Sequence, residues 1–293
     1  MVLTVVIFFV LYQISAAAHD NTFIGITEKV LIGIVLFGSF FILNFIVKKN
    51  GLSKDSSYTI LVYFLLHLFI PHIFENFNLV LSNFFVLLAF RRLISLQSLK
   101  FAKEKVFDAS LWIFVAALFH FWSILFIVLV FISILVHVAR DYRNWLLPFI
   151  ALFAVAVSFL LFALVFNEQR ISYLFANSEI DFKIDYFTSN YQNLALSLYV
   201  PVALFFLASL LLTLSNRPLV LHTSYNKTIA LFVIGIIIYV ISPGKSNDLI
   251  VFTMAPVAMM ATSHLELKHP QWQKEVILGL LVLMGFFTFF TQL

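Results

Sequence analysis

Residues 91–143 read RRLISLQSLKFAKEKVFDASLWIFVAALFHFWSILFIVLVFISILVHVARDYR, and this stretch decides how the chain is threaded. Basic residues lie at both of its ends, and residues 108–138 between them are almost uncharged. A single helix over residues 108–138 would be roughly 46 Å long, whereas the hydrocarbon core of a bilayer is about 30 Å thick. The alternative is a hairpin that turns at residues 120–122.

The whole chain has the composition of a helical membrane protein. Of its 293 residues, 62% are hydrophobic and only 11% are charged. Apolar runs long enough to cross a bilayer recur from end to end, and they are continuous rather than alternating as in a transmembrane β-barrel. The basic residues lie in short loops beside these runs, so the formal charge of +4 indicates orientation and not a nucleic-acid partner.

We expect an all-α, polytopic transmembrane bundle of about eleven helices, or of nine helices plus a re-entrant hairpin. The first run is expected to be a retained helix, because no Lys or Arg precedes it as in a signal peptide. The predicted helices cover residues 2–18, 30–47, 58–74, 79–90, 108–119, 123–138, 145–166, 194–214, 228–242, 249–264 and 276–293. Residues 1–293 form a single integral membrane domain, with a periplasmic loop at 167–193 and a basic interfacial segment in the cytoplasm at 91–107.

The positive-inside rule orients this threading. With the amino terminus in the cytoplasm and a hairpin at 108–138, 14 of the 18 Lys and Arg residues lie inside and 4 outside. A single crossing at 108–138 would give 11 against 7. The hairpin is therefore favoured, and the carboxyl terminus is predicted to be periplasmic. The rule does not separate two short crossings from a re-entrant loop.

Residues suited to catalysis, ion transport or metal binding are rare within the apolar runs. No Asp, Glu, Lys or Arg lies at the predicted centre of a helix, where ion-coupled transporters place such groups. The chain has no cysteine. If the helix at 58–74 and the hairpin tip are neighbours, His72 and His120 face each other near the outer surface, but a metal site needs three or four converging ligands. We therefore predict no metal and no cofactor.

The longest polar loop contains an alternating segment at residues 179–187. Period two predicts an extended chain with one apolar face resting on the helices or on lipid. The sharper hypothesis places Asp181 or Asp185, together with Asp20, at the mouth of an outward-facing site. A carboxylate there would act as a general base or hold a divalent cation.

On the inner side, the segment that begins at Arg91 and Arg92 is rich in Lys and Arg. Such a segment binds lipid headgroups or a polyprenyl phosphate. The simpler interpretation is that it is an orientation signal alone.

Four segments resemble an uncharacterised, multi-pass membrane family, a domain of unknown function, of flavobacteria-type bacteria. They are residues 44–50, 81–96, 107–110 and 143–148. The resemblance covers residues 1–290 and implies a bacterial inner-membrane location. It brings no known active site.

A weaker similarity is to membrane polysaccharide polymerases, which pair an arginine-bearing helix with a later Ala-x-x-Phe-His-x-Ser pattern. Residues 116–120 fit that pattern, whereas Ser123 comes one residue late and Arg92 stands where those enzymes have glutamine. The similarity implies an enzyme that acts on a lipid-linked glycan. Its candidate catalytic residues are His120, Arg91 and Asp20, and its candidate substrate-binding residues are His72, Asp181, Asp185 and Arg92.

Three functions follow from the sequence. The leading hypothesis is a membrane scaffold or subunit that binds lipid or partner helices through its Phe-rich surface, which draws on 37 Phe residues. The second is a periplasm-facing enzyme that acts on a lipid-linked glycan. The third is a carrier of an apolar small molecule. The expected partners are membrane lipid, a lipid-linked glycan or other membrane proteins, and no nucleic acid.

Overall fold

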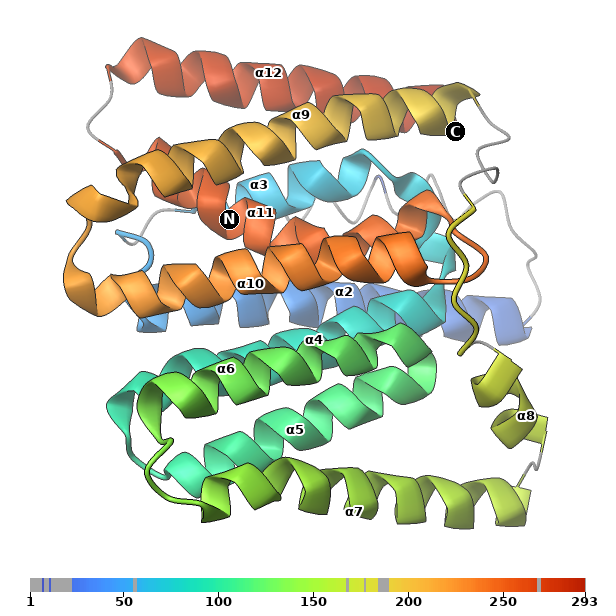
Figure 1. Ribbon diagram of the computed structural model, residues 1–293. Helices are drawn as coiled ribbons and strands as arrows, with labels where there is room; N and C mark the ends of the chain where they lie inside the picture. Colours follow the sequence, from blue (N-terminus) through green and yellow to red (C-terminus); the bar gives the residue numbers. More distant parts are fainter. Residues whose placement is uncertain are drawn as a thin grey trace.

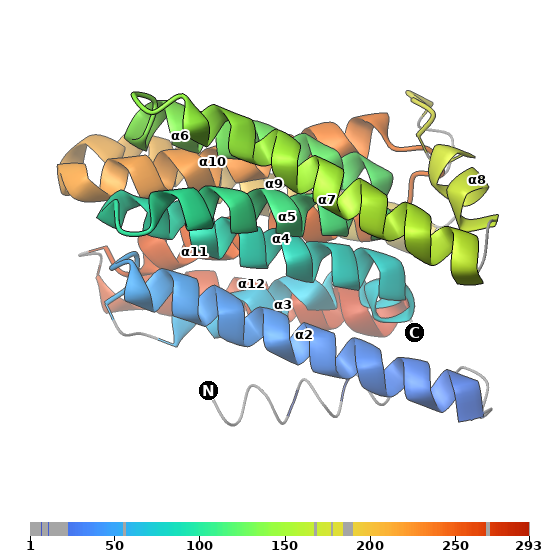
Figure 2. The same ribbon diagram turned by 90° about the horizontal axis from the view of Figure 1, so that it is seen from below.

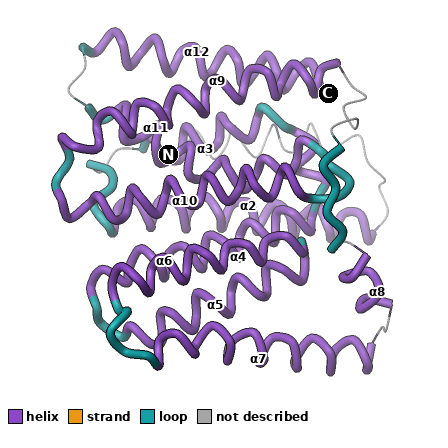
Figure 3. The backbone as a smooth tube through the Cα atoms, in the orientation of Figure 1, coloured by secondary structure: helices purple, strands orange, loops and turns teal. Residues whose placement is uncertain are grey.

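The computed structural model describes residues 7, 11, 23–54, 57–166, 169–176, 178–183, 190–267 and 270–292. The predicted helix at 2–18 lies outside the described residues except for positions 7 and 11. The described part consists of helices and the loops that join them, and it contains no strand (Figure 3).

The helices run roughly antiparallel in a bundle (Figure 1). The α-helices are α2 (Phe23–Lys49), α3 (Tyr58–Leu68), α4 (Phe77–Ser95), α5 (Ala102–Phe119), α6 (Ile127–His137), α7 (Arg143–Phe166), α8 (Gln169–Ala176), α9 (Asn190–Thr213), α10 (Leu219–Ile241), α11 (Val251–Leu265) and α12 (Gln271–Gln292). Short 3-10 turns are η1 (Pro71–Glu75), η2 (Leu96–Ser98), η3 (Phe121–Phe126), η4 (Leu214–Asn216) and η5 (Asn247–Ile250).

Ten of the predicted helices are present at the expected positions, namely α2 to α7 and α9 to α12. Seven helical segments of the described part are long and apolar enough to cross a membrane, fewer than the eleven expected. The other three are α3 and α6, which have only 11 residues each, and α5, which has 18 residues but four charged side chains in its first two turns. The short helix α8 was not predicted.

Helix α11 forms the centre of the bundle. It packs against α3, α9 and α10, and almost all of its residues are buried. Ala255, Ala258 and Ala261 recur at helical spacing, and small side chains allow neighbouring helices to approach closely. Helix α7, by contrast, lies at the edge of the bundle (Figure 1), where it is nearest to the viewer in Figure 2, and it packs mainly against α5.

The predicted hairpin is present. Helix α5 ends at His120, whose extended backbone (φ −141°, ψ 107°) stops the helix, and η3 and α6 return the chain. Helix α5 begins at Ala102 rather than at residue 108, which makes it 18 residues long. The segment at 91–107 is divided between the end of α4, the turn η2 and the start of α5.

One end of the bundle, here called the basic end, carries most of the described cations: Lys48, Lys49, Lys54, Arg91, Arg92, Lys100, Lys103, Lys105, Arg140, Arg143, Arg217, Lys227 and Lys274. Helices α2, α4 and α11 end there. Lys227 lies deeper than expected, because α10 begins nine residues before the predicted helix start and includes it. Its side chain is 2% exposed, so a helix of this bundle does bury a Lys.

Candidate functional site

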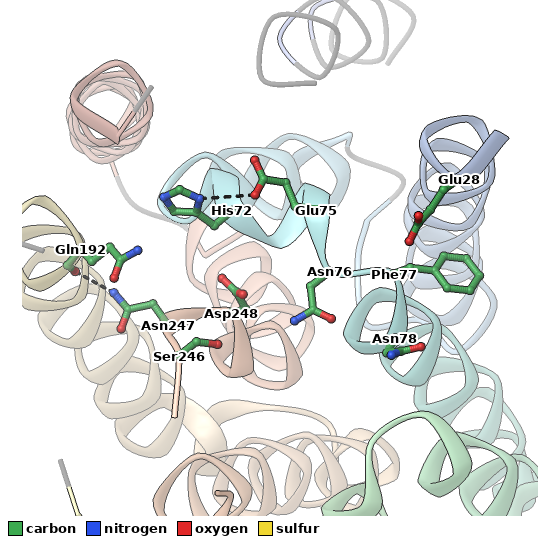
Figure 4. Close-up of a pocket in the computed structure, with 10 residues that line it drawn as sticks. All are labelled: Glu28, His72, Glu75, Asn76, Phe77, Asn78, Gln192, Ser246, Asn247 and Asp248. Atoms are coloured by element: carbon green, nitrogen blue, oxygen red, sulfur yellow. Dashed lines mark hydrogen bonds and ion pairs between the residues drawn. The ribbon is translucent and has the colours of Figure 1, made fainter. Parts of the chain in front are cut away.

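A polar pocket of about 460 Å³ opens at the end of the bundle opposite the basic end, which we call the pocket end (Figure 4). Helix α2 begins near it, η1 leads into α4 there, and α10 is joined to α11 there. Its lining is almost entirely polar: Glu28, His72, Glu75, Asn76, Phe77, Asn78, Gln192, Ser246, Asn247 and Asp248.

Two chain reversals position these side chains. Pro71 opens the short turn η1, and the Asn76 side chain then accepts a 3.3 Å hydrogen bond from the Leu79 backbone N–H at the start of α4. After α10, the chain turns through Gly244, which has a positive φ of 55° that glycine adopts without strain. This second turn presents residues 246–248 to the pocket.

Side chains from both reversals meet at the floor of the pocket. The Asp248 carboxylate lies near the side chains of Asn76 and Ser246 (Figure 4). The Asn247 amide nitrogen donates a 2.8 Å hydrogen bond to the Gln192 carbonyl oxygen. Asn247 is 3% exposed, yet its side-chain oxygen has no hydrogen-bond partner in the structure. A buried acceptor without a partner is costly, so this oxygen is an unsatisfied group in the wall of the pocket.

The rim of the pocket carries the remaining charges. His72 Nδ1 lies 3.8 Å from a Glu75 carboxylate oxygen, and both side chains are partly exposed (Figure 4). Glu28 of α2 lies across the pocket from them and is exposed. With Asp248, the lining holds three carboxyl groups against one imidazole. The pocket therefore favours ligands that donate hydrogen bonds or carry positive charge.

A smaller pocket of about 150 Å³ adjoins the first one and contains His120. The Ser242 hydroxyl donates to the Ile238 carbonyl oxygen at 2.7 Å, so its single proton is already used. The 3.2 Å contact between His120 Nε2 and Ser242 Oγ therefore requires Nε2 to be the donor. Burial lowers the pKa of His120 to about 4, which keeps the ring neutral and leaves Nδ1 as a hydrogen-bond acceptor.

An apolar groove of about 430 Å³ adjoins the His120 pocket and lies along the outside of the bundle. Helix α5 tilts away from α7 towards the pocket end, and the groove lies between these two helices (Figure 1). Its lining is Leu111, Val115, Leu118, Phe119, Ala154, Val155, Ser158, Phe159 and Phe162.

These three hollows form one series. The polar pocket and the His120 pocket share Asn76, Asn78 and Ser246. The His120 pocket and the apolar groove share Leu118 and Phe119. The polar pocket at the end of the bundle, the His120 pocket and the groove on the apolar side thus adjoin one another along shared walls.

The predicted site residues are only partly brought together. His72 and His120 line adjoining pockets at the pocket end. Arg91 lies near the basic end, twelve residues or roughly 18 Å of helix beyond Leu79, which lines the His120 pocket. Arg92 also lies at the basic end and forms a 2.8 Å ion pair with Asp108. A joint site of His120 and Arg91 is therefore not assembled within the chain.

The predicted acids have different positions. Asp181 binds through its backbone: its N–H donates to the Ile241 carbonyl oxygen at 3.1 Å, and its own carbonyl accepts from Lys245. Its side chain accepts from the Lys183 N–H at 2.9 Å. Asp20 and Asp185 lie outside the described residues.

Of the residues that line the polar pocket, only His72 was a predicted site residue, and the others, Asn247 and Asp248 among them, were not. The available signal was a cluster of polar residues at each of two predicted helix boundaries, residues 75–78 and 243–248. Nothing in the sequence indicated that these two boundaries meet. Among the described residues, no group of three or more His, Asp or Glu side chains is arranged to hold a metal ion.

The long apolar helices of the described part are typical of an α-helical membrane protein. The chain belongs to a family of unknown function, DUF6427, whose model matches residues 1–293. No curated protein and no solved structure matches the chain.

Proposed function

We propose that this protein is an integral protein of the bacterial inner membrane that binds a lipid. The polar group of the lipid occupies the polar pocket and the His120 pocket, and one of its chains lies in the apolar groove between α5 and α7. The observation that carries the proposal is that these hollows adjoin one another and share lining residues. A ligand with one polar and one apolar part matches polar pockets that lie beside an apolar groove.

The placement of the groove supports a lipid chain as its occupant. Helix α7 exposes large apolar side chains along its length, as a helix that borders hydrocarbon does. A groove in such a surface is open sideways to the bilayer. A chain can therefore enter it without leaving the apolar phase.

The orientation is also part of the proposal. The basic end is cytoplasmic by the positive-inside rule, so the pocket end and the carboxyl terminus face the periplasm. The lipid then comes from the outer leaflet of the inner membrane. The lipid-binding part of the leading hypothesis gains support from the pockets, and the binding of partner helices stays a prediction.

The experiment is native mass spectrometry of the protein purified in a mild detergent, with three forms compared. Ala154→Trp fills the groove, while Val157→Trp adds the same ring to an exposed position of α7 that does not line it. We expect the wild type and Val157→Trp to retain lipid, and Ala154→Trp to lose it at least tenfold. Equal retention by all three forms, or no lipid on the wild type, would contradict the proposal.

A second candidate is an enzyme that acts on a lipid-linked glycan from the periplasmic side. It is favoured by one observation, namely that His72, His120 and several acids line adjoining pockets. Arg91 takes no part in this site. Accumulation of a lipid-linked glycan in cells with His120→Ala, but not with Arg91→Ala, would support the enzyme.

A further inference from the structure

We propose that the polar pocket selects an uncharged, polyhydroxylated headgroup, so that the bound lipid is a glycolipid whose sugar lies over Asn247 and Asp248. This inference rests on the proposed lipid-binding function and names the class of lipid. The hydrogen-bond donors and acceptors of the lining indicate this class.

The side-chain amide of Asn247 has only one of its two ends paired. Its amide nitrogen is already engaged by the Gln192 carbonyl oxygen. Its oxygen remains without a partner although the residue is 97% buried. Asn247 borders the pocket, and its buried oxygen still lacks a donor, which a hydroxyl group supplies if the side chain turns towards it.

The charges of the lining residues disfavour an anionic headgroup. Glu28, Glu75 and Asp248 border the pocket, and His72 is its one basic side chain among the described residues. A phosphate only accepts hydrogen bonds and would lie among three carboxyl groups. Repulsion between like charges therefore disfavours a phosphate in this pocket.

The amides distinguish a sugar from an ammonium group. Four amide side chains border the pocket, from Asn76, Asn78, Gln192 and Asn247. An amide offers donors as well as an acceptor, whereas an ammonium group only donates. A sugar hydroxyl both donates and accepts, so it matches amides and carboxylates together.

The His120 pocket extends the same chemistry. Its neutral imidazole uses Nε2 towards Ser242 and keeps Nδ1 as an acceptor. The adjoining polar pocket, with a volume of about 460 Å³, falls within the usual size range of small-ligand pockets. A sugar in the pocket and a glycerol or similar linker beside His120 would then lead to the chain in the groove.

The test compares three lipids with identical dioleoyl chains: a monoglucosyl diacylglycerol, a phosphatidylglycerol and a phosphatidylethanolamine. Binding to the full-length protein is measured by native mass spectrometry with the lipids in competition. We expect the glycolipid to bind about tenfold better than either phospholipid, since a hydrogen bond to a charged group contributes about a factor of ten. Asp248→Asn should abolish most of this preference and keep the chain-dependent binding.

Glu104→Gln is the matched control, because Glu104 is an exposed acid near the basic end. Glu28→Gln at the exposed rim is a second variant that decides the question if Asp248→Asn does not fold; we expect it to lower the preference about threefold. Equal binding of the three lipids, or a preference for either phospholipid, would overturn the sugar assignment and leave the lipid site standing. Absence of binding by all three would overturn both proposals.

Discussion

The Lys227 ammonium group donates a 2.6 Å hydrogen bond to the Leu93 carbonyl oxygen, which links the interior of α10 to the last turn of α4. Leu93 also accepts from the Leu96 backbone N–H that caps this helix. Cations near a helix carboxyl end are stabilised by the helix dipole. The contact therefore places the buried Lys227 amino group where α4 is negative.

The first prediction concerns this contact. Lys227→Met removes a buried charge and leaves the Leu93 carbonyl paired with its cap, so we expect a change of less than about 1.5 kcal/mol in the free energy of unfolding. Lys227→Glu places a carboxylate against a carbonyl oxygen and should cost more than about 3 kcal/mol. Denaturation in mixed micelles measures both. Similar losses for the two variants would contradict this account.

The second prediction concerns the hairpin tip. Ser82 of α4 donates to the Ala116 carbonyl oxygen at 3.1 Å, and its Oγ lies 2.7 Å from Ser123 Oγ, which must then donate to it. Ser82→Ala should cost about 1 kcal/mol, because the buried Ser123 hydroxyl loses its acceptor. A double-mutant cycle with Ser123→Ala should give a coupling of about 0.6 kcal/mol.

Ser110→Ala is the control for the hairpin. That serine is equally buried but bonds only to the Val106 carbonyl oxygen of its own helix. We expect a loss of less than about 0.5 kcal/mol there. A zero coupling between positions 82 and 123 would show that the two hydroxyl groups do not hold the hairpin.

The third prediction compares two helical glycines. A Cβ on Gly235 would lie 2.9 Å from the Thr253 methyl carbon and 3.2 Å from the Phe252 backbone, whereas a Cβ on Gly279 would meet nothing within 4 Å. Gly235→Ala should therefore destabilise the protein by about 1–3 kcal/mol. Gly279→Ala should be neutral or stabilise α12 by up to about 1 kcal/mol through helix propensity. Thermal unfolding of the two variants in detergent measures the difference, and the same sign for both would refute close packing of α10 on α11.

The fourth prediction tests the orientation. The chain has no cysteine, so a single introduced thiol reports its own position. Asn216→Cys lies at the basic end and Lys183→Cys at the pocket end, and both positions are exposed. An impermeant thiol reagent added to intact spheroplasts should label position 183 and not position 216. Labelling of position 216 alone would invert the proposed orientation and place the pocket in the cytoplasm.

The amino-acid sequence by itself determined the class of protein and most of the helices. Continuous apolar runs in a chain with 11% charged residues leave a helical membrane protein as the physical solution, because each helix satisfies its own backbone hydrogen bonds. The turn at His120 was also predictable, since residues 108–138 are too long for one crossing. These features are local, so periodicity and length were enough.

The site, in contrast, was decided by tertiary structure. Asn76 and Asp248 are 172 positions apart, and only the packing of the helices brings the start of α4 beside the start of α11. The same packing separates Arg91 from His120, two residues that the sequence motif had joined. A pocket made from helix ends depends on which helices are neighbours, and in a bundle of similar apolar helices the side-chain packing that selects neighbours leaves no periodic signal in the sequence.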